Sequence, residues 1–373
     1  MEYLDRLFTI EDPYCTSDEC REIYFKAMKE VFEFHYTRNE VYRKVCDFED
    51  FSPDDLKTPD DIRHIPHIMV NVLKWYTLRT LPEEEIAYEF TSSGTSGQKS
   101  HVLCDTASKE RQNRMRERIV KAVGVPTQKP VNYIVFSYDP EIAGNKGAAY
   151  THNMYTTFAP AKDKFFAIHA NEKGVPQFDE DGVLKKLEEY AKDKNTPLRL
   201  VGFPAFMHEI ALTLKEKHLS YDFNHEESMV ITGGGWKDKQ EKSIPYELFK
   251  KEIHETLGIP MSNFRDIYGF VEHGVPYLTC REGHFHVPIY ASVFVRKPGH
   301  LEFLGFAKKG LLHLLSPYNL AQPTISILST DYGMLKNNCT CGIKTPYIEL
   351  LGRAGKQKHK GCAITAAELL KNA

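Results

Sequence analysis

The sequence predicts an α/β protein with a mostly parallel sheet and a smaller antiparallel β region. Stretches rich in β-branched and aromatic residues at 131–138, 198–204, 228–235 and 264–272 are expected to be strands. They alternate with helical segments of ten or more residues, a pattern typical of parallel sheets. From about 283 to 350 the pattern changes to short β-rich segments separated by Pro and Gly turns. This change predicts antiparallel strands that close the same domain.

Helical spacing of apolar residues among Glu and Lys predicts helices at 17–45, over much of 58–80, at 106–123 and at 181–194. Further helices are expected after the second and third strands. Ligands of parallel sheets gather at the C-terminal ends of the strands. Because glycine-rich and polar loops follow these strands, a binding site is expected at that edge of the sheet.

Composition excludes several classes of function. The 373 residues carry a net charge of -3, so bulk electrostatics give no support to nucleic-acid binding. No run approaches the roughly 18–20 apolar residues of a membrane helix, and the acidic N-terminus lacks the pattern of a signal peptide. The eight cysteines are therefore expected to be reduced thiols, and the predicted location is cytoplasmic.

A run of small hydroxyl residues and glycines, TSSGTSG at 91–97, predicts a phosphate-binding loop. Its N–H groups and hydroxyls suit phosphate oxygens, and Lys99 adds a positive charge. The glycine spacing is not that of a P-loop, and a flexible Ser/Gly linker is the alternative. The shortness of the run within a folded context favours the loop. Its predicted phosphate contacts are Ser92, Ser93, Gly94, Thr95, Ser96 and Gly97.

Several further motifs follow in order along the chain. These are the glycine turn at 233–235, YGFVE at 268–272, STDYG at 329–333 and LGRAGKQKHKGCAITAAEL at 351–369. Together with TSSGTSG they resemble the signatures of adenylate-forming enzymes, which include acyl- and aryl-CoA ligases, luciferases and peptide-synthetase adenylation domains. The resemblance runs from about residue 88 to the C-terminus. It implies the fold of that family's N-terminal core, with ATP and Mg²⁺ as cofactors.

The resemblance also assigns roles in nucleotide binding. Tyr268 would stack on adenine, Glu272 would hold Mg²⁺, Asp331 would accept hydrogen bonds from both ribose hydroxyls, and Arg353 would reach the ribose or a phosphate. The nucleotide-binding set is completed by Gly234, Gly235 and Gly269. Taken singly, Tyr268, Glu272 and Asp331 are better explained as a core aromatic, a surface charge and a turn cap. Their order along the chain favours the site.

The chain departs from the family pattern in two places. Lys99 stands where the family has proline, and Ser100 stands where it has a basic residue, so the catalytic role expected for Lys99 rests on its position beside the loop. The sequence ends 20 residues after Arg353, and the family's usual C-terminal domain is therefore expected to be missing. The predicted division is a core at 1–350, helical over 1–80, and a hinge with a short arm at 351–373.

Cys362 follows Gly361 in this basic arm and is the predicted catalytic nucleophile. Neighbouring lysines, with Arg353 and His359, would favour the thiolate, which is the reactive form. The alternative is that Cys362 is a small apolar residue at the start of the last helix.

TSSGTSGQ and GCAITAAELL, with the chain length, resemble the acyl-protein synthetases of the bacterial bioluminescence fatty-acid reductase complex. That resemblance implies activation of a long-chain, tetradecanoyl-type fatty acid to acyl-AMP. The acyl group would pass to Cys362 and then to a cysteine of the reductase subunit, where reduction by NADPH supplies aldehyde for luciferase. An acyl-transferase (thioesterase) subunit would provide the acid.

A C-x-C-G knuckle at 339–342 predicts a structural zinc site. Cys339, Cys341, Cys280 and His286 would form a tetrahedral Cys₃His set, with His284 as a neighbour. Members similar to phenylacetate-CoA ligase carry a comparable knuckle. Unpaired buried thiols are the alternative.

Two other functions stay open at this level. An acyl- or aryl-CoA ligase with a truncated C-terminus would release its thioester to coenzyme A without using Cys362. A non-catalytic adenylate-binding subunit would show no pyrophosphate exchange.

Overall fold

The first sheet is parallel at its centre, as predicted, in a computed structural model that describes residues 1–92, 98–143, 147–171, 173–236 and 243–353. The strand order is β10-β9-β8-β7-β4-β5-β6, and only β10 and β6, at the edges, pair antiparallel. The strands are β4 (Val131–Tyr138), β5 (Ala161–Ala170), β6 (Pro176–Phe178), β7 (Leu198–Gly202), β8 (Met229–Thr232), β9 (Phe264–Tyr268) and β10 (Tyr277–Leu278). The four predicted strands are confirmed, whereas β5, β6 and β10 have no counterpart in the prediction.

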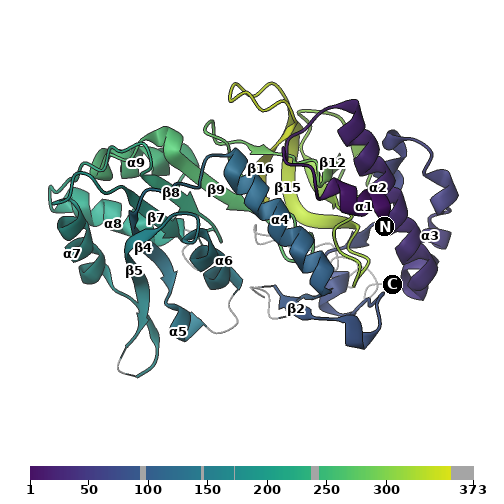
Figure 1. Ribbon diagram of the computed structural model, residues 1–373, viewed down its shortest axis with the longest axis horizontal. Coiled ribbons are helices and arrows are strands. Elements are labelled where there is room, and N and C mark those ends of the chain that lie inside the picture. The colour runs from purple at the N-terminus through teal and green to yellow at the C-terminus, as the bar shows by residue number, and fades with distance from the viewer. Residues whose placement is uncertain (93–97, 144–146, 172, 237–242, 354–373) are drawn as a thin grey trace, which may run out of the picture.

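Helices cover both faces of this sheet, and the alternation of β4 side chains shows how. Ile134 and Phe136 pack into one core with α7, α8 and α9. Tyr133 and Val135 point to the opposite face, into a second core that includes residues of α4 and α6. The helices are α4 (Thr106–Ala122), α5 (Pro140–Ala143), α6 (Gly147–Tyr155), α7 (Glu180–Tyr190), α8 (Pro204–Glu216) and α9 (Tyr246–Leu257). Figure 1 shows α7, α8 and α9 on the outer left side of the molecule.

The predicted antiparallel region forms a second sheet in the order β11-β16-β15-β14-β12-β13, with the short β1 added to β15 in parallel. Its strands are β1 (Ile68–Met69), β11 (Phe285–His286), β12 (Ser292–Arg296), β13 (Phe303–Leu304), β14 (Gly310–Leu315), β15 (Ser326–Lys336) and β16 (Tyr347–Arg353). A separate hairpin, β2 (Tyr88–Thr91) and β3 (His101–Cys104), flanks the predicted phosphate loop. The long β15 is the central element of the second sheet.

The N-terminal segment packs its helices against the second sheet (Figure 1). These helices are α1 (Glu2–Leu7), α2 (Asp18–Arg38) and α3 (Glu40–Phe48). The single helix predicted over 17–45 is interrupted at Asn39, whose side chain accepts a hydrogen bond from the Tyr42 N–H and so begins α3.

The helix predicted over much of 58–80 is wrong. The chain there forms a 3₁₀ helix at Pro59–His64, the short strand β1 and a second 3₁₀ turn at Val72–Lys74. Pro66 lacks an N–H group to donate within a helix, and this favours the break. Local apolar spacing could not show that Ile68 and Met69 pair with β15 instead.

The expectation that all cysteines are reduced thiols is also wrong for one pair. Cys15 and Cys20 form a disulfide with their Cα atoms 6.3 Å apart. Ser17, the N-cap of α2, accepts a hydrogen bond from the Cys20 N–H and turns the chain back between the two cysteines. Within the described residues, Cys46, Cys104, Cys280, Cys339 and Cys341 are free.

One continuous core links the two sheets. It contains Val201 and Ile231 from the parallel sheet, Leu314 and Ile327 from the antiparallel sheet, and Phe32 from α2. The sheets are therefore held against each other by apolar packing, and the end of β9 lies beside β15. Among the described residues, no helix has the length and apolar character needed to cross a membrane.

Candidate functional site

The two sheets meet in a direct contact between predicted site residues. The Tyr268 hydroxyl at the end of β9 donates a hydrogen bond to Asp331 Oδ2 on β15, with the two oxygens 3.1 Å apart. Asp331 is 7% exposed, and its N–H donates to the Ser329 hydroxyl. The structure thus brings together an aromatic ring and a carboxylate that are separated by 63 residues. These are the two groups that were predicted to contact the adenine ring and the ribose of one nucleotide.

Glu272 lies in the tight turn that follows β9. The turn is closed by hydrogen bonds from the His273 and Gly274 N–H groups to the Phe270 carbonyl. Gln112 on α4 donates to the Gly274 carbonyl at 3.0 Å and fixes the turn from outside. Glu272 is 4% exposed, and no ion pair joins it to a basic side chain in the described part of the chain. A buried carboxylate of this kind favours a cation as its partner.

The predicted glycine turn lies at the end of β8. Gly234 and Gly235 have φ values of 74° and 64°, a left-handed conformation that glycine adopts without strain, and both are exposed. Gly233 is buried, and its N–H donates to the Gly202 carbonyl at 3.1 Å. Because glycine has no side chain, the backbone is uncovered at the C-terminal edge of the parallel sheet, where a ligand is expected.

Sequence analysis missed a buried histidine beside this turn. His152 on α6 is 1% exposed, and its Nδ1 is 2.9 Å from the Ser137 hydroxyl on β4. A Cβ atom added to Gly233 would lie 3.3 Å from His152 Nε2. Nothing in the surrounding YTHNMY pattern marks His152 as part of a site, because only the packing of α6 against the ends of β4 and β8 brings it there.

The base of the predicted phosphate loop is a closed pair of hydrogen bonds. The Ser92 N–H donates to the Ser100 carbonyl at 3.2 Å, and the Ser100 N–H donates to the Ser92 hydroxyl at 2.9 Å. Lys99 is exposed beside this base, and Gln98 donates to the Lys74 carbonyl. The predicted phosphate contacts between the two serines, Ser93, Gly94, Thr95, Ser96 and Gly97, lie outside the described residues.

The hinge begins at the end of β16. Arg353 is the register partner of Asp331 across β15 and β16, so its backbone lies next to the predicted ribose carboxylate. Gly352, with a φ of 110°, precedes it. The Arg353 side chain and Cys362, the predicted nucleophile, lie outside what the structure describes.

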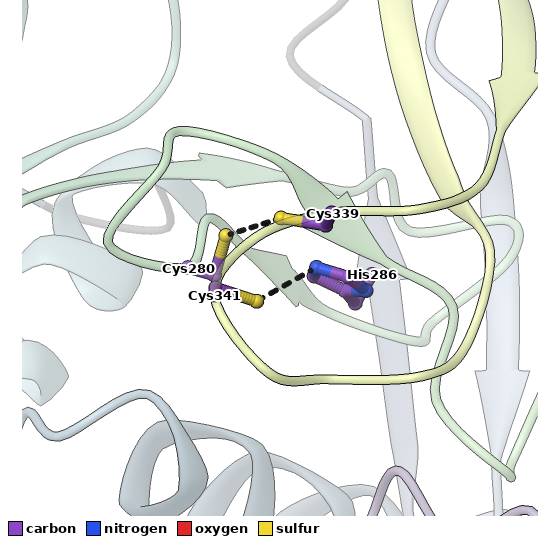
Figure 2. A group of neighbouring side chains, drawn as sticks. All are labelled: Cys280, His286, Cys339 and Cys341. Carbon is purple, nitrogen blue, oxygen red and sulfur yellow. Dashed lines mark hydrogen bonds between the residues drawn. The ribbon is translucent and has the colours of Figure 1, made fainter.

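The four predicted zinc ligands come together in the structure. Cys280, His286, Cys339 and Cys341 each offer one atom, and these atoms all lie within 4.8 Å of one another. Figure 2 shows the side chains converging from two loops and from β11. The sulfurs of Cys280 and Cys339 are 3.8 Å apart, and Cys341 Sγ is 3.3 Å from His286 Nε2.

The fold is similar to that of solved structures. The chain is similar to the crystal structure of a 2-hydroxyisobutyryl-CoA ligase in the postadenylation state, with a TM-score of 0.65 and 15% identity, over 92% of this chain and 69% of that chain. An open conformation of the same ligase gives a TM-score of 0.62 at 16% identity, over 89% of this chain and 74% of that one. The architecture is that of the adenylate-forming ligases.

Within this class, the chain belongs to the acyl-protein synthetase family, LuxE, whose family model matches residues 2–371. It is 28% identical over 371 residues to a long-chain-fatty-acid–luciferin-component ligase of Aliivibrio fischeri, covering 98% of this chain and 93% of that protein. It is 23% identical over 351 residues to the enzyme of the same name from Vibrio harveyi, covering 94% and 89% of the two chains. Membership of this family makes the chain an acyl-protein ligase, as its motifs predicted.

Proposed function

We propose that this protein activates a long-chain fatty acid with ATP, carries the acyl group on Cys362 and delivers it to a cysteine of a fatty-acid reductase subunit. The observation that carries the proposal is the contact between Tyr268 and Asp331, which brings the predicted adenine-stacking ring and the predicted ribose carboxylate together across the two sheets. The names of the bacterial relatives support a long-chain fatty acid as the substrate.

In the first step, a carboxylate oxygen of the fatty acid attacks the α-phosphorus of ATP, and the bond to the departing pyrophosphate breaks. Tyr268 would stack on the adenine, and Asp331 would accept hydrogen bonds from the ribose hydroxyls. The backbone N–H groups of Gly234, Gly235 and Gly269 would border the nucleotide. Donors of the loop at 92–97, with the nearby ammonium group of Lys99, would stabilise the negative charge that grows on the phosphates.

Magnesium fits the chemistry of the turn after β9. Glu272 supplies one buried carboxylate, and Mg²⁺ is commonly held by one or two carboxylates together with substrate phosphates. When bound, the ion would neutralise charge on the phosphates. The protein's own part is to hold Glu272 still, through the turn that Gln112 fixes from α4.

In the second step, the Cys362 thiolate attacks the acyl carbonyl carbon, a thioester forms and AMP leaves. A thiolate on the reductase subunit then attacks this thioester, which moves the acyl group and returns Cys362 to its thiolate form. Arg353 ties the arm to the site, because its backbone pairs with Asp331. Reduction of the second thioester by the partner would give an aldehyde, and an acyl-transferase subunit would supply the acid.

The test is to incubate the protein with Mg²⁺, ATP and radiolabelled tetradecanoic acid, beside Cys362→Ser. Pyrophosphate exchange reports acyl-AMP formation, and hydroxylamine-sensitive label on the chain reports the thioester. We expect both signals for the wild type and exchange without label for Cys362→Ser. Cys46→Ala is the matched control, because it removes a buried thiol on α3 and should keep both signals.

Other outcomes would overturn parts of the proposal. Label that persists in Cys362→Ser would exclude this residue as the carrier. Exchange with release of a coenzyme A thioester, and no label on the chain, would instead indicate an acyl-CoA ligase. Absence of exchange, with the reductase subunit present as well as without it, would leave a nucleotide-binding subunit.

A further inference from the structure

The cysteine–histidine cluster lies where the chain passes from one sheet to the other. Cys280 follows β10, the edge strand of the parallel sheet, and His286 is on β11, the edge strand of the antiparallel sheet. Cys339 and Cys341 come from the connection between β15 and β16. The four side chains thus join two segments about 60 residues apart, at the junction of the sheets.

Two distances between ligand atoms match those around one tetrahedral zinc ion. With Zn–S bonds of about 2.3 Å and Zn–N bonds of about 2.0–2.1 Å, a tetrahedron places two sulfurs about 3.8 Å apart and a sulfur and a nitrogen about 3.5 Å apart. The observed distances are 3.8 Å between the sulfurs of Cys280 and Cys339 and 3.3 Å between Cys341 Sγ and His286 Nε2. Small shifts would therefore complete the coordination sphere.

The hydrogen bonds of His286 leave the correct nitrogen available. Its Nδ1 is 2.9 Å from the Thr345 carbonyl oxygen, which can only accept, so Nδ1 carries the proton. Nε2 is then unprotonated and points its lone pair toward Cys341 (Figure 2). Metal-bound histidines usually donate their other N–H to a carbonyl or carboxylate in this manner, because that bond fixes the ring and its tautomer.

Other groups are placed to support thiolates rather than thiols. His284 Nδ1 is 3.0 Å from Cys339 Sγ, and the Ile343 N–H donates to Cys341 Sγ at 3.4 Å. His284 also stacks on Tyr347 with the ring centres 4.1 Å apart, which holds it beside the sulfur as a donor. Tyr14 packs its edge on His286, and its buried hydroxyl has no hydrogen-bond partner in the described structure.

From this geometry we infer that Cys280, His286, Cys339 and Cys341 bind one structural zinc ion that clamps the two sheets together beside the nucleotide site. Four protein ligands leave no open position, so the ion has a structural role and not a catalytic one. The clamp acts on both halves of the site. Tyr268 on β9 pairs with Tyr277 on β10, just before Cys280, and Asp331 lies on β15, which leads to Cys339.

The first experiment measures metal content, so it does not depend on the proposed function. The full chain, expressed without a histidine tag in medium containing zinc and purified without chelators, is analysed by mass spectrometry of its metals. We expect about one zinc per chain. Zinc below about a tenth of an equivalent, or one equivalent of a different metal, would overturn the inference. Replacement with Co²⁺ should give the thiolate-to-metal charge-transfer absorption of a tetrahedral Cys₃His site.

Matched variants separate ligands from neighbours. His286→Ala should lose zinc, whereas His284→Ala should keep it, and Cys104→Ala should also keep it because Cys104 is a buried free thiol elsewhere. Equal retention by both histidine variants would contradict the ligand set. Removal of zinc from the wild type with a thiol-reactive mercurial should lower the midpoint of thermal unfolding by at least about 5 °C. If the variants do not fold, the zinc content and cobalt spectrum of the wild type still decide the question.

Discussion

The two sheets contribute to the nucleotide site in different ways. The parallel sheet offers residues where its strands end: Tyr268 is the last residue of β9, and the glycine turn follows β8. The antiparallel sheet offers Asp331 from the interior of β15, where its backbone pairs with Arg353 of β16 and lies beside a register shift in the ladder with β14. One half of the site therefore depends on the conformations of loops, and the other depends on strand register.

Buried histidines in this protein differ in the partners that surround them. His208 in the helices of the parallel half is 2.7 Å from the carboxylate of Glu252, which can compensate a positive charge. In the other half, His35 on α2 lies between the Thr80 hydroxyl and the Asn319 carbonyl oxygen, and neither of these groups is charged. Burial lowers the pKa of His35 to about 4 and holds the pKa of His313 well below its usual range. Acid should therefore destabilise the packing around His35 and His313.

The largest effect on stability is expected at Gly202, the last residue of the parallel strand β7. Gly202 has a φ of 136°, and an added Cβ would lie 2.3 Å from the Phe136 carbonyl oxygen. Gly202→Ala should lower the free energy of unfolding by about 3–5 kcal/mol, since it combines backbone strain with a clash against a fixed strand. Urea denaturation gives the value. Gly305→Ala, where a Cβ meets nothing within 4 Å, should stay within about 0.5 kcal/mol of the wild type. Equal midpoints for the two variants would contradict the prediction.

The second prediction concerns pH. Because His35 has a lower pKa in the folded protein than the ordinary value of 6.5, the unfolded chain binds the extra proton between pH 6.5 and about 4. Stability from this residue is complete above pH 6.5 and falls by about 3 kcal/mol as the pH drops to about 4. His35→Gln cannot take up that proton. Its urea midpoint should fall less steeply than that of the wild type between pH 7.5 and 4.5, and parallel curves would show that His35 is not responsible.

The third prediction concerns Asp331, which β15 contributes to the nucleotide site. Asp331→Ala removes the carboxylate proposed to accept the ribose hydroxyls. The loss of about 2–3 kcal/mol should raise the KM for ATP in pyrophosphate exchange by about 30- to 150-fold. Asp331→Asn keeps one acceptor oxygen and should lose less. An unchanged KM in a folded Asp331→Ala variant, as judged by its urea midpoint, would remove Asp331 from the site.

The smallest effect is expected for the hydroxyl of Tyr268, at the end of β9. Tyr268→Phe keeps the ring for stacking and loses only the hydroxyl that donates to Asp331. A cost of about 1 kcal/mol predicts roughly a fivefold rise in the KM for ATP. Tyr268→Ala should raise it further, because the stacking surface is also lost. If the Phe and Ala variants behave alike, the hydroxyl and not the ring is the important group.

Local patterns were sufficient to predict the strands β4, β7, β8 and β9 and the change to antiparallel strands after residue 283. The family resemblance proposed Tyr268 and Asp331, and residue chemistry proposed the four cluster residues; the structure brings the members of each set together. Reasoning from local patterns failed at Asn39, which divides a helix that apolar spacing predicts to be continuous. It also failed at 58–80, where pairing with β15 prevails over helical periodicity.

The sequence by itself determined which residue types are available and in what local conformation, because periodicity, glycine and proline act over a few residues. Only the tertiary structure decided which of them meet. The Tyr268–Asp331 contact spans 63 residues, His152 reaches the glycine turn through the packing of α6, and Cys15 pairs with Cys20 through the cap of α2. Such contacts depend on how sheets pack and strands pair across long separations, and no local pattern encodes that geometry.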